Sequence, residues 1–237
     1  MRALIFAAGL GERMRPLTAH TPKPLLTAAD KPLIVWHLEK LAAAGVRDVV
    51  VNVSWLADRF APALGDGSAF GVRLHYALEG PTPLETGGGM LHALSLLGDA
   101  PFIAVNGDIW TDYAFDRLPR DPAGDAHLVL VDNPDHHPSG DFTLDGGRVH
   151  TEGTRRLTFA GIGVYRPRLL ARWQDAVGDA PGADACPPRF KLAPVLRQAM
   201  ADRRVEGEHH PGAWTDVGTP QRLAALDASL RRSLRSD

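Results

Sequence analysis

Apolar residues in the first half of the chain form short continuous runs, separated by stretches with helical spacing. Continuous runs are typical of strands buried on both faces, and they occur at residues 3–8, 49–53 and 102–106. A further strand is expected at residues 72–77. Ile34, Leu38 and Leu41 instead recur on one helix face, after Pro32 and before Gly45. Strands that alternate with helices predict a Rossmann-like α/β fold, a mixed, mainly parallel sheet covered by helices on both faces.

The second half carries weaker patterns. Strands are expected at residues 127–132 and 157–165, and a hairpin is expected around Asp145-Gly146-Gly147. Further helices are expected at residues 55–64, 90–97, 191–200 and 220–234, the second of them entered through Gly87-Gly88-Gly89. Residues 178–188, rich in glycine, alanine and proline, predict a surface loop.

Composition excludes several classes of protein. A formal net charge of −2 and a pI near 6.5 argue against nucleic-acid binding through a broad basic face. Cys186 has no partner for a disulfide, and no histidine and cysteine cluster has the spacing of a zinc site. No charged leader precedes a long apolar stretch, and no run reaches the roughly twenty apolar residues of a membrane span. We therefore expect a cytoplasmic protein that does not contact membranes.

The strand at residues 3–8 leads directly into a glycine-rich segment. Gly9 and Gly11 expose backbone N–H groups there, and Arg13, Arg15 and Lys23 add positive charge. These features favour binding of a polyphosphate, and hence of a nucleotide. A tight turn without a ligand is the plainer alternative. Pro22 and Pro24 make that alternative less attractive, because prolines on both sides of Lys23 stiffen the segment and hold the lysine at one point.

Two familiar phosphate-binding loops do not fit this segment. A dinucleotide fingerprint requires a third glycine at position 14, where Met14 stands. A P-loop requires Gly-Lys-Ser/Thr after the second glycine, whereas the chain continues with Glu12-Arg13.

The segment AAGLGERMRPLT, followed by PKP, resembles the signature of the sugar-1-phosphate nucleotidylyltransferases. Four later blocks extend the resemblance over nearly the whole chain: LETGGG at 84–89, VNGDIWTDY at 105–113, FKLAPVLRQAM at 190–200 and WTDVGT at 214–219. Together they resemble one branch of the family, the uridylyltransferases that act on N-acetylmuramate α-1-phosphate in peptidoglycan recycling. The resemblance implies transfer of UMP from UTP to this sugar phosphate, with Mg²⁺ as cofactor and small molecules as substrates.

The resemblance also assigns residues to roles. It implies catalytic roles for Arg13, Lys23 and Asp108, and Mg²⁺ binding by Asp108 and Asp216. The implied nucleotide-binding residues are Ala8, Gly9, Gly11, Glu12, Arg13, Lys23 and Gly87. The implied sugar-phosphate-binding residues are Asn106, Gly140, Glu152 and Gly161. We expect a single domain over residues 1–237, with a nucleotide-binding part at 1–113, a sugar-phosphate-binding lobe at 114–213 and a metal-ligand motif with a C-terminal helix at 214–237.

Some alternatives stay open at this stage. Many relatives follow the glutamate of the sugar lobe with Lys-Pro, whereas this chain has Gly153 and then Thr154, so Arg155, Arg156 or Lys191 would have to meet the phosphate. A mannose-1-phosphate guanylyltransferase would share the same phosphate-handling residues. A non-catalytic regulatory subunit that binds a nucleotide sugar is a third possibility, and a monomer or weak dimer is expected.

Overall fold

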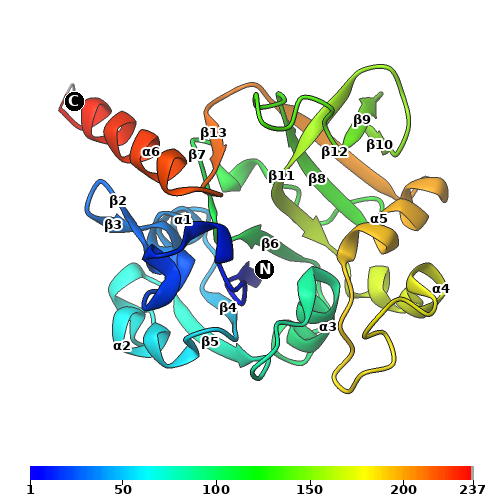
Figure 1. Cartoon of the computed structure of the whole chain (residues 1–237). Helices are drawn as coiled ribbons and strands as arrows, with labels where there is room; N and C mark the ends of the chain where they lie inside the picture. The colour runs from blue at the N-terminus through cyan, green and yellow to red at the C-terminus, as the bar shows by residue number, and fades with distance from the viewer. Residues whose placement is uncertain (236–237) are drawn as a thin grey trace.

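The first strands of the chain form the parallel half of a mixed sheet. In the computed structural model, which describes residues 1–235, strands β1 (Ala3–Phe6), β4 (Asp48–Val53), β5 (Arg73–Leu78) and β6 (Phe102–Asn106) lie in the order β5-β4-β1-β6 (Figure 1). All neighbours among them pair in parallel, and β1 is flanked on both sides. Because β1, β4 and β6 are buried on both faces, they carry the continuous apolar runs that predicted them, whereas the edge strand β5 is only partly buried.

The second half of the sheet is built mainly from antiparallel pairs. Its strands are β11 (Arg156–Tyr165), β8 (Ala126–Val131), β12 (Val205–His210), β10 (Arg148–His150) and β9 (Phe142–Asp145), which continue from β6 in that order. The long strand β11 is antiparallel to β6 and β8, and only β12 and β8 are parallel here. A bulge in β11 between Phe159 and Ile162 contains Gly161, whose φ is +74°.

Helices cover both faces of the sheet, as predicted (Figure 1). On one face, α1 (Leu33–Ala43) and α2 (Phe60–Leu64) share one apolar core with the strands. On the other face, α3 (Glu85–Leu97), α4 (Trp173–Val177) and α5 (Leu192–Ala201) share a second core. Burying both faces removes the apolar strands from water, which is the main favourable contribution to folding.

A third apolar cluster joins the two ends of the chain. Helix α6 (Pro220–Ser233) contributes Leu223, Leu226 and Leu230, which pack with Met14 of the glycine-rich segment. Two small antiparallel ribbons lie beside this cluster, β2 (Thr27–Ala28) with β3 (Lys31–Pro32) and β7 (Ile109–Thr111) with β13 (Trp214–Asp216). The end of the predicted terminal part, residues 236–237, lies outside the described residues.

Two predicted helices differ from the observed ones. The helix expected at residues 55–64 is a 3-10 turn at Ala57–Arg59 followed by the short α2, because Leu56 adopts a φ of +51° and Pro62 is tolerated only in a first turn. The helix expected to begin after Gly89 begins at Glu85, so the three glycines lie inside its first turns. The short strands β7, β12 and β13 were not anticipated.

Candidate active site

The loop after β1 is held by hydrogen bonds near both of its ends. Ala7 N donates to Asn52 Oδ1 over 2.7 Å, and Thr18 Oγ1 donates to Gly11 O over 2.8 Å. Gly11 has a φ of +65°, and a Cβ there would lie 2.8 Å from the Thr18 methyl carbon, so the position requires glycine. At Gly9 no atom lies within 4 Å of a Cβ position. The loop is therefore anchored on the protein side and open on the other.

This loop forms one wall of a cavity of about 640 Å³ at the carboxyl ends of β1 and β6. Open α/β sheets bind ligands at this edge. Of the residues predicted to handle the nucleotide or the metal, the cavity is lined by Ala8, Gly9, Gly11, Glu12, Arg13, Lys23 and Asp108. Ala8 and Asp108, which are 100 positions apart in the sequence, thus line the same cavity, as their predicted roles require.

Lys23 and Asp108 form an ion pair inside this cavity. Lys23 Nζ lies 2.6 Å from Asp108 Oδ2, and the side chain of Lys23 is only 10% exposed. Lys23 begins a 3-10 turn, Lys23–Leu25, which follows Pro22 and includes the buried Pro24. The backbone therefore fixes where the ammonium group lies, and the Asp108 carboxylate pairs with it.

The two predicted metal-binding acids come together through the ribbon of β7 and β13. Asp216 is the register partner of Ile109, and Val217 N donates to Asp108 O over 2.8 Å. The Asp216 carboxylate lies 2.7 Å from Arg222 Nη1 and 2.8 Å from His136 Nε2. The ribbon thus places two acids from distant parts of the sequence on adjacent backbone segments.

This pair of acids fits Mg²⁺ better than a transition metal. Mg²⁺ is usually held by one or two carboxylates, and water and substrate phosphates supply its other ligands. Among residues 1–235, no group of three or more histidine, cysteine, aspartate or glutamate side chains is arranged to hold a metal ion. Two carboxylates beside the glycine-rich loop match this pattern for Mg²⁺ without a third acidic or histidine side chain. Of the two acids, Asp108 lines the cavity, and Asp216 stands two residues before Gly218, which also lines it.

A buried hydrogen-bond network supports the glycine-rich loop from below. Asn52 Oδ1 accepts from Ala7 N, while Asn52 Nδ2 donates to Glu79 Oε1 over 2.5 Å. Glu79 Oε2 in turn accepts from Leu84 N over 2.7 Å, just before α3. Burial raises the pKa of the Glu79 carboxyl, and the bonds from Leu84 and Asn52 oppose this shift. The network links the ends of β1, β4 and β5 to the start of α3, and Asn52 and Glu79 themselves line the cavity.

Removing Asn52 is expected to destabilise the protein through this network. In Asn52→Ala, Ala7 N and Glu79 Oε1 lose their partners inside the protein, which we expect to lower the free energy of unfolding by about 3 kcal/mol. Urea denaturation measures the change. Ser54→Ala at the end of the same strand loses one bond, to Gly80 O, and should cost only about 1 kcal/mol. Equal losses in the two variants would contradict a shared network at Asn52.

Gly87 does not line the cavity. Its N–H donates to Phe190 O over 2.9 Å, and a Cβ at this position would lie 2.5 Å from the Phe190 ring. A Cβ added at Gly88 would be similarly close to Pro188 O, and one added at Gly89 would be similarly close to Glu79 Oε1. Close packing therefore explains the three glycines, and it is also why α3 can begin before them. The predicted contact between Gly87 and the base finds no support in this position, whereas Glu85 and Thr86 do line the cavity.

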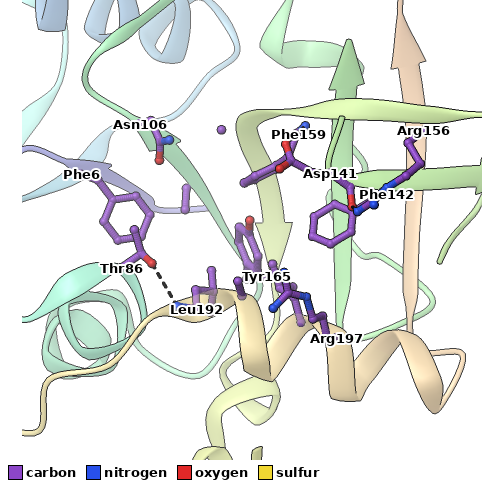
Figure 2. Close-up of a pocket in the computed structure, with 14 residues that line it drawn as sticks. Phe6, Thr86, Asn106, Asp141, Phe142, Arg156, Phe159, Tyr165, Leu192 and Arg197 are labelled. Carbon is purple, nitrogen blue, oxygen red and sulfur yellow. Dashed lines mark hydrogen bonds between the residues drawn. The ribbon is translucent and has the colours of Figure 1, made fainter. Parts of the chain in front are cut away.

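A second, smaller pocket of about 230 Å³ adjoins the first (Figure 2). Asn106 and Phe6 line both, so the pockets meet at the ends of β1 and β6. Gly161 lines the smaller one, and a Cβ there would lie 2.6 Å from Asn106 Nδ2. Two of the four residues predicted to bind the sugar phosphate, Asn106 and Gly161, are therefore brought together.

The other two residues predicted for the sugar phosphate lie elsewhere. Gly140, with a φ of +58°, packs against Asn133 and the backbone of Arg156. Glu152 is exposed in the segment between β10 and β11 and lines neither pocket. Their part in sugar binding stays a prediction, since Gly140 packs within a turn and Glu152 is exposed and lines neither pocket.

Sequence reasoning missed several residues that the fold brings to these pockets. Arg189 lines the larger pocket, and Asp141 and Arg197 line the smaller one. Arg156, one of the three residues considered for the sugar phosphate, also lines the smaller pocket, whereas Arg155 and Lys191 line neither. Arg197 belongs to the FKLAPVLRQAM block, so its charge in the middle of a half-buried helix was the available signal. Arg189 lies in an irregular segment, and no pattern in the sequence predicts that its side chain lines the larger pocket.

The adjacent histidines at positions 136 and 137 contact different acids. His136 contacts Asp216, and His137 Nε2 lies 3.1 Å from Asp141 Oδ1. Asp132 pairs instead with His209. These side chains therefore serve the tertiary structure rather than one common ion.

Comparison with known proteins agrees with this geometry. The model of the family described as nucleotidyl transferase matches residues 2–143. The N-acetylmuramate alpha-1-phosphate uridylyltransferase of Neisseria meningitidis serogroup B is 48% identical over 238 residues, which cover 96% of this chain and 97% of that protein. The chain belongs to the nucleotidyl transferase family. The predicted family and the prediction of an enzyme are thereby confirmed.

More distant nucleotidyl transferases resemble the chain as well. A mannose-1-phosphate guanyltransferase of Aspergillus fumigatus is 31% identical to this chain. The matched region covers 93% of this chain and 62% of that protein. A solved Bacillus anthracis structure in complex with a sucrose superposes with a TM-score of 0.81 at 19% identity, covering 98% of this chain and 95% of that one. The predicted fold class is confirmed by this likeness. Within residues 1–235, none of the helices is both long and apolar enough to cross a membrane.

Proposed function

We propose that this nucleotidyl transferase transfers UMP from UTP to N-acetylmuramate α-1-phosphate, giving UDP-N-acetylmuramate and pyrophosphate for peptidoglycan recycling. The observation that carries the proposal is the convergence of the glycine-rich loop, Lys23 and Asp108 on one cavity, which adjoins a sugar-sized pocket. Identity of 48% to the Neisseria meningitidis uridylyltransferase over nearly the whole length of both chains supports the choice of base and sugar.

The reaction is a displacement at phosphorus. An oxygen of the sugar 1-phosphate attacks the α-phosphorus of UTP, the bond from that phosphorus to the bridging β-oxygen breaks, and pyrophosphate leaves with the electron pair. The attacking oxygen is anionic near neutral pH, so the enzyme needs no general base. The main obstacle is repulsion between two anionic substrates, and stabilisation of charge is the contribution expected of the protein.

The charged residues of the cavity suit this task. Lys23 would meet the α-phosphate, because its ammonium group is held in the larger cavity beside Asp108. Arg13 lines the cavity and has no partner among the described residues, so its guanidinium is free for the leaving pyrophosphate. Asp108 and Asp216 would hold Mg²⁺, which supplies charge neutralisation between the two substrates when bound.

Arg13→Gln is expected to lower kcat by about tenfold to a hundredfold, with little change in the KM for the sugar phosphate. Arg13 is exposed, so solvent screens its charge more than that of Lys23, and the loss should be smaller than the 10²–10³ typical of a buried donor. Steady-state kinetics of pyrophosphate release measures both parameters. Arg15→Gln, in the same segment but outside the cavity lining, is the matched control. A raised sugar KM with unchanged kcat would place Arg13 on the other substrate.

A matrix of nucleoside triphosphates against sugar 1-phosphates tests the proposed function directly. We expect the highest rate of pyrophosphate release with UTP and N-acetylmuramate α-1-phosphate. A preference for GTP and mannose 1-phosphate would favour the guanylyltransferase alternative, which is supported by the similarity to the Aspergillus fumigatus guanyltransferase. Binding of the UDP-sugar without turnover in any combination would indicate a regulatory subunit. Cytoplasmic location and a monomeric or weakly dimeric state stay predictions.

A further inference from the structure

The smaller pocket presents two guanidinium groups to a largely apolar space. Phe142, Phe159 and Tyr165 form much of its wall, and Arg156 and Arg197 are the cations that line it. Arg156 comes from the start of β11, and Arg197 comes from α5 across the pocket (Figure 2). An apolar pocket with a few placed charges is typical of a site that selects one polar group of its ligand.

Arg197 has no partner within the part of the chain that the structure describes. No hydrogen bond or ion pair reaches its guanidinium, whereas Arg156 donates to the carbonyl oxygen of Asp141. The Asp141 carboxylate, the acid in this pocket, already accepts from Phe159 N over 2.8 Å and contacts His137. The charge of Arg197 is therefore available to a ligand.

Arg197 also lies away from the reacting phosphate. Asn106 marks the end of the pocket that adjoins the cavity with Lys23 and Asp108. Figure 2 shows Arg197 at the other side of the pocket, beyond Tyr165. An anion bound to Arg197 would thus be a different part of the substrate from the 1-phosphate.

We infer that Arg197 is a specificity-determining residue that binds a carboxylate carried on the sugar ring. The inference rests on the proposed function, since N-acetylmuramate differs from N-acetylglucosamine by a lactyl ether that ends in a carboxylate. Guanidinium and carboxylate match in shape and form two parallel hydrogen bonds. Arg197 is solvent-exposed, and a neutral sugar would leave its guanidinium without an anionic partner in the pocket. The enzyme therefore selects acidic sugar phosphates through a residue that takes no part in phosphoryl chemistry.

The test compares three sugar phosphates with UTP: N-acetylmuramate α-1-phosphate, the same compound with its lactyl carboxylate converted to an amide, and N-acetylglucosamine 1-phosphate. The wild type should prefer the acid to the amide by roughly tenfold to a hundredfold in kcat/KM, the range for a hydrogen bond to a charged group. In Arg197→Gln, kcat/KM for the acid should fall by a similar factor, mainly through KM, while the two neutral sugars change by less than about threefold. The preference for the acid should largely disappear.

Arg172→Gln is the matched control, because it removes an exposed arginine that pairs with Asp175 and lines neither pocket. It should keep the wild-type preference. An equal loss for all three sugars in Arg197→Gln, or an unchanged preference for the acid, would overturn the inference while the proposed function stands. A wild type that is inactive with N-acetylmuramate α-1-phosphate but active with another sugar would overturn the proposed function, and the inference with it.

Discussion

Replacing Asp108 with asparagine is expected to lower kcat by about 10²–10³-fold while the protein stays folded. The substitution keeps the shape of the side chain but removes the charge that pairs with Lys23 over 2.6 Å and that would bind Mg²⁺. Loss of one positioned electrostatic group at a transition state typically costs about 3–4 kcal/mol. The concentration of Mg²⁺ needed for half-maximal rate should also rise. Pyrophosphate release across a Mg²⁺ titration measures both effects.

Asp112→Asn is the matched control for this variant. Asp112 lies four residues further along the chain, contacts His210 Nε2 at 2.6 Å and lines neither pocket. Its replacement should leave kcat and the Mg²⁺ requirement nearly unchanged. If Asp108→Asn behaved like this control, Asp108 would have no part in metal binding or catalysis, and the ion pair with Lys23 would be structural.

Lys23→Met should produce a loss of similar size, about 10²–10³-fold in kcat. Methionine fills the volume of the lysine stem, so the buried packing around Pro22 and Pro24 is retained and only the ammonium group is lost. The lysine is nearly buried, so its charge is weakly screened and acts strongly on a phosphate nearby. Steady-state kinetics should show the effect in kcat rather than in either KM.

Lys31→Met separates this effect from the general loss of a positive charge. Lys31 pairs with Glu39 at 2.6 Å outside both pockets, so its replacement should leave kcat close to that of the wild type. The double variant Lys23→Met with Asp108→Asn should lose less than the product of the single losses, because each group acts through the same cavity. Independent, multiplicative losses would mean that the two residues serve separate steps.

The apolar patterns predicted the regular elements well where the strands are buried on both faces. Residues 49–53 and 102–106 are strands β4 and β6, and the helix around Leu38 is α1. The prediction failed where side-chain pattern carries little information. Strand β12 reads VEGEHH and is recognisable only from its parallel pairing with β8. The helix entered through Gly87-Gly88-Gly89 began too late in the prediction, since glycine is a poor helix former and only its packing against Phe190 explains its place.

The candidate site was predicted best where function depends on the local backbone. The open loop at Gly9 and Gly11 and the fixed Lys23 follow from glycine and proline, whose effects act within a few residues. The positions of Gly140 and Glu152 were carried over from a family resemblance. They line neither pocket, because the direction of a side chain in a lobe depends on turns that the resemblance does not specify.

The sequence by itself determined the fold class, the family and the glycine-rich loop after β1, because buried strands, glycine turns and proline restraints act locally and leave a readable pattern. Only the tertiary structure decided which acids become neighbours and which cations stay free. The ribbon of β7 and β13 brings Asp216 beside Asp108, the buried network joins Asn52 to Glu79, and α5 places Arg197 in the smaller pocket. Each of these depends on contacts between residues far apart in the chain, and their sequence separation carries no signal of the distance between them in space.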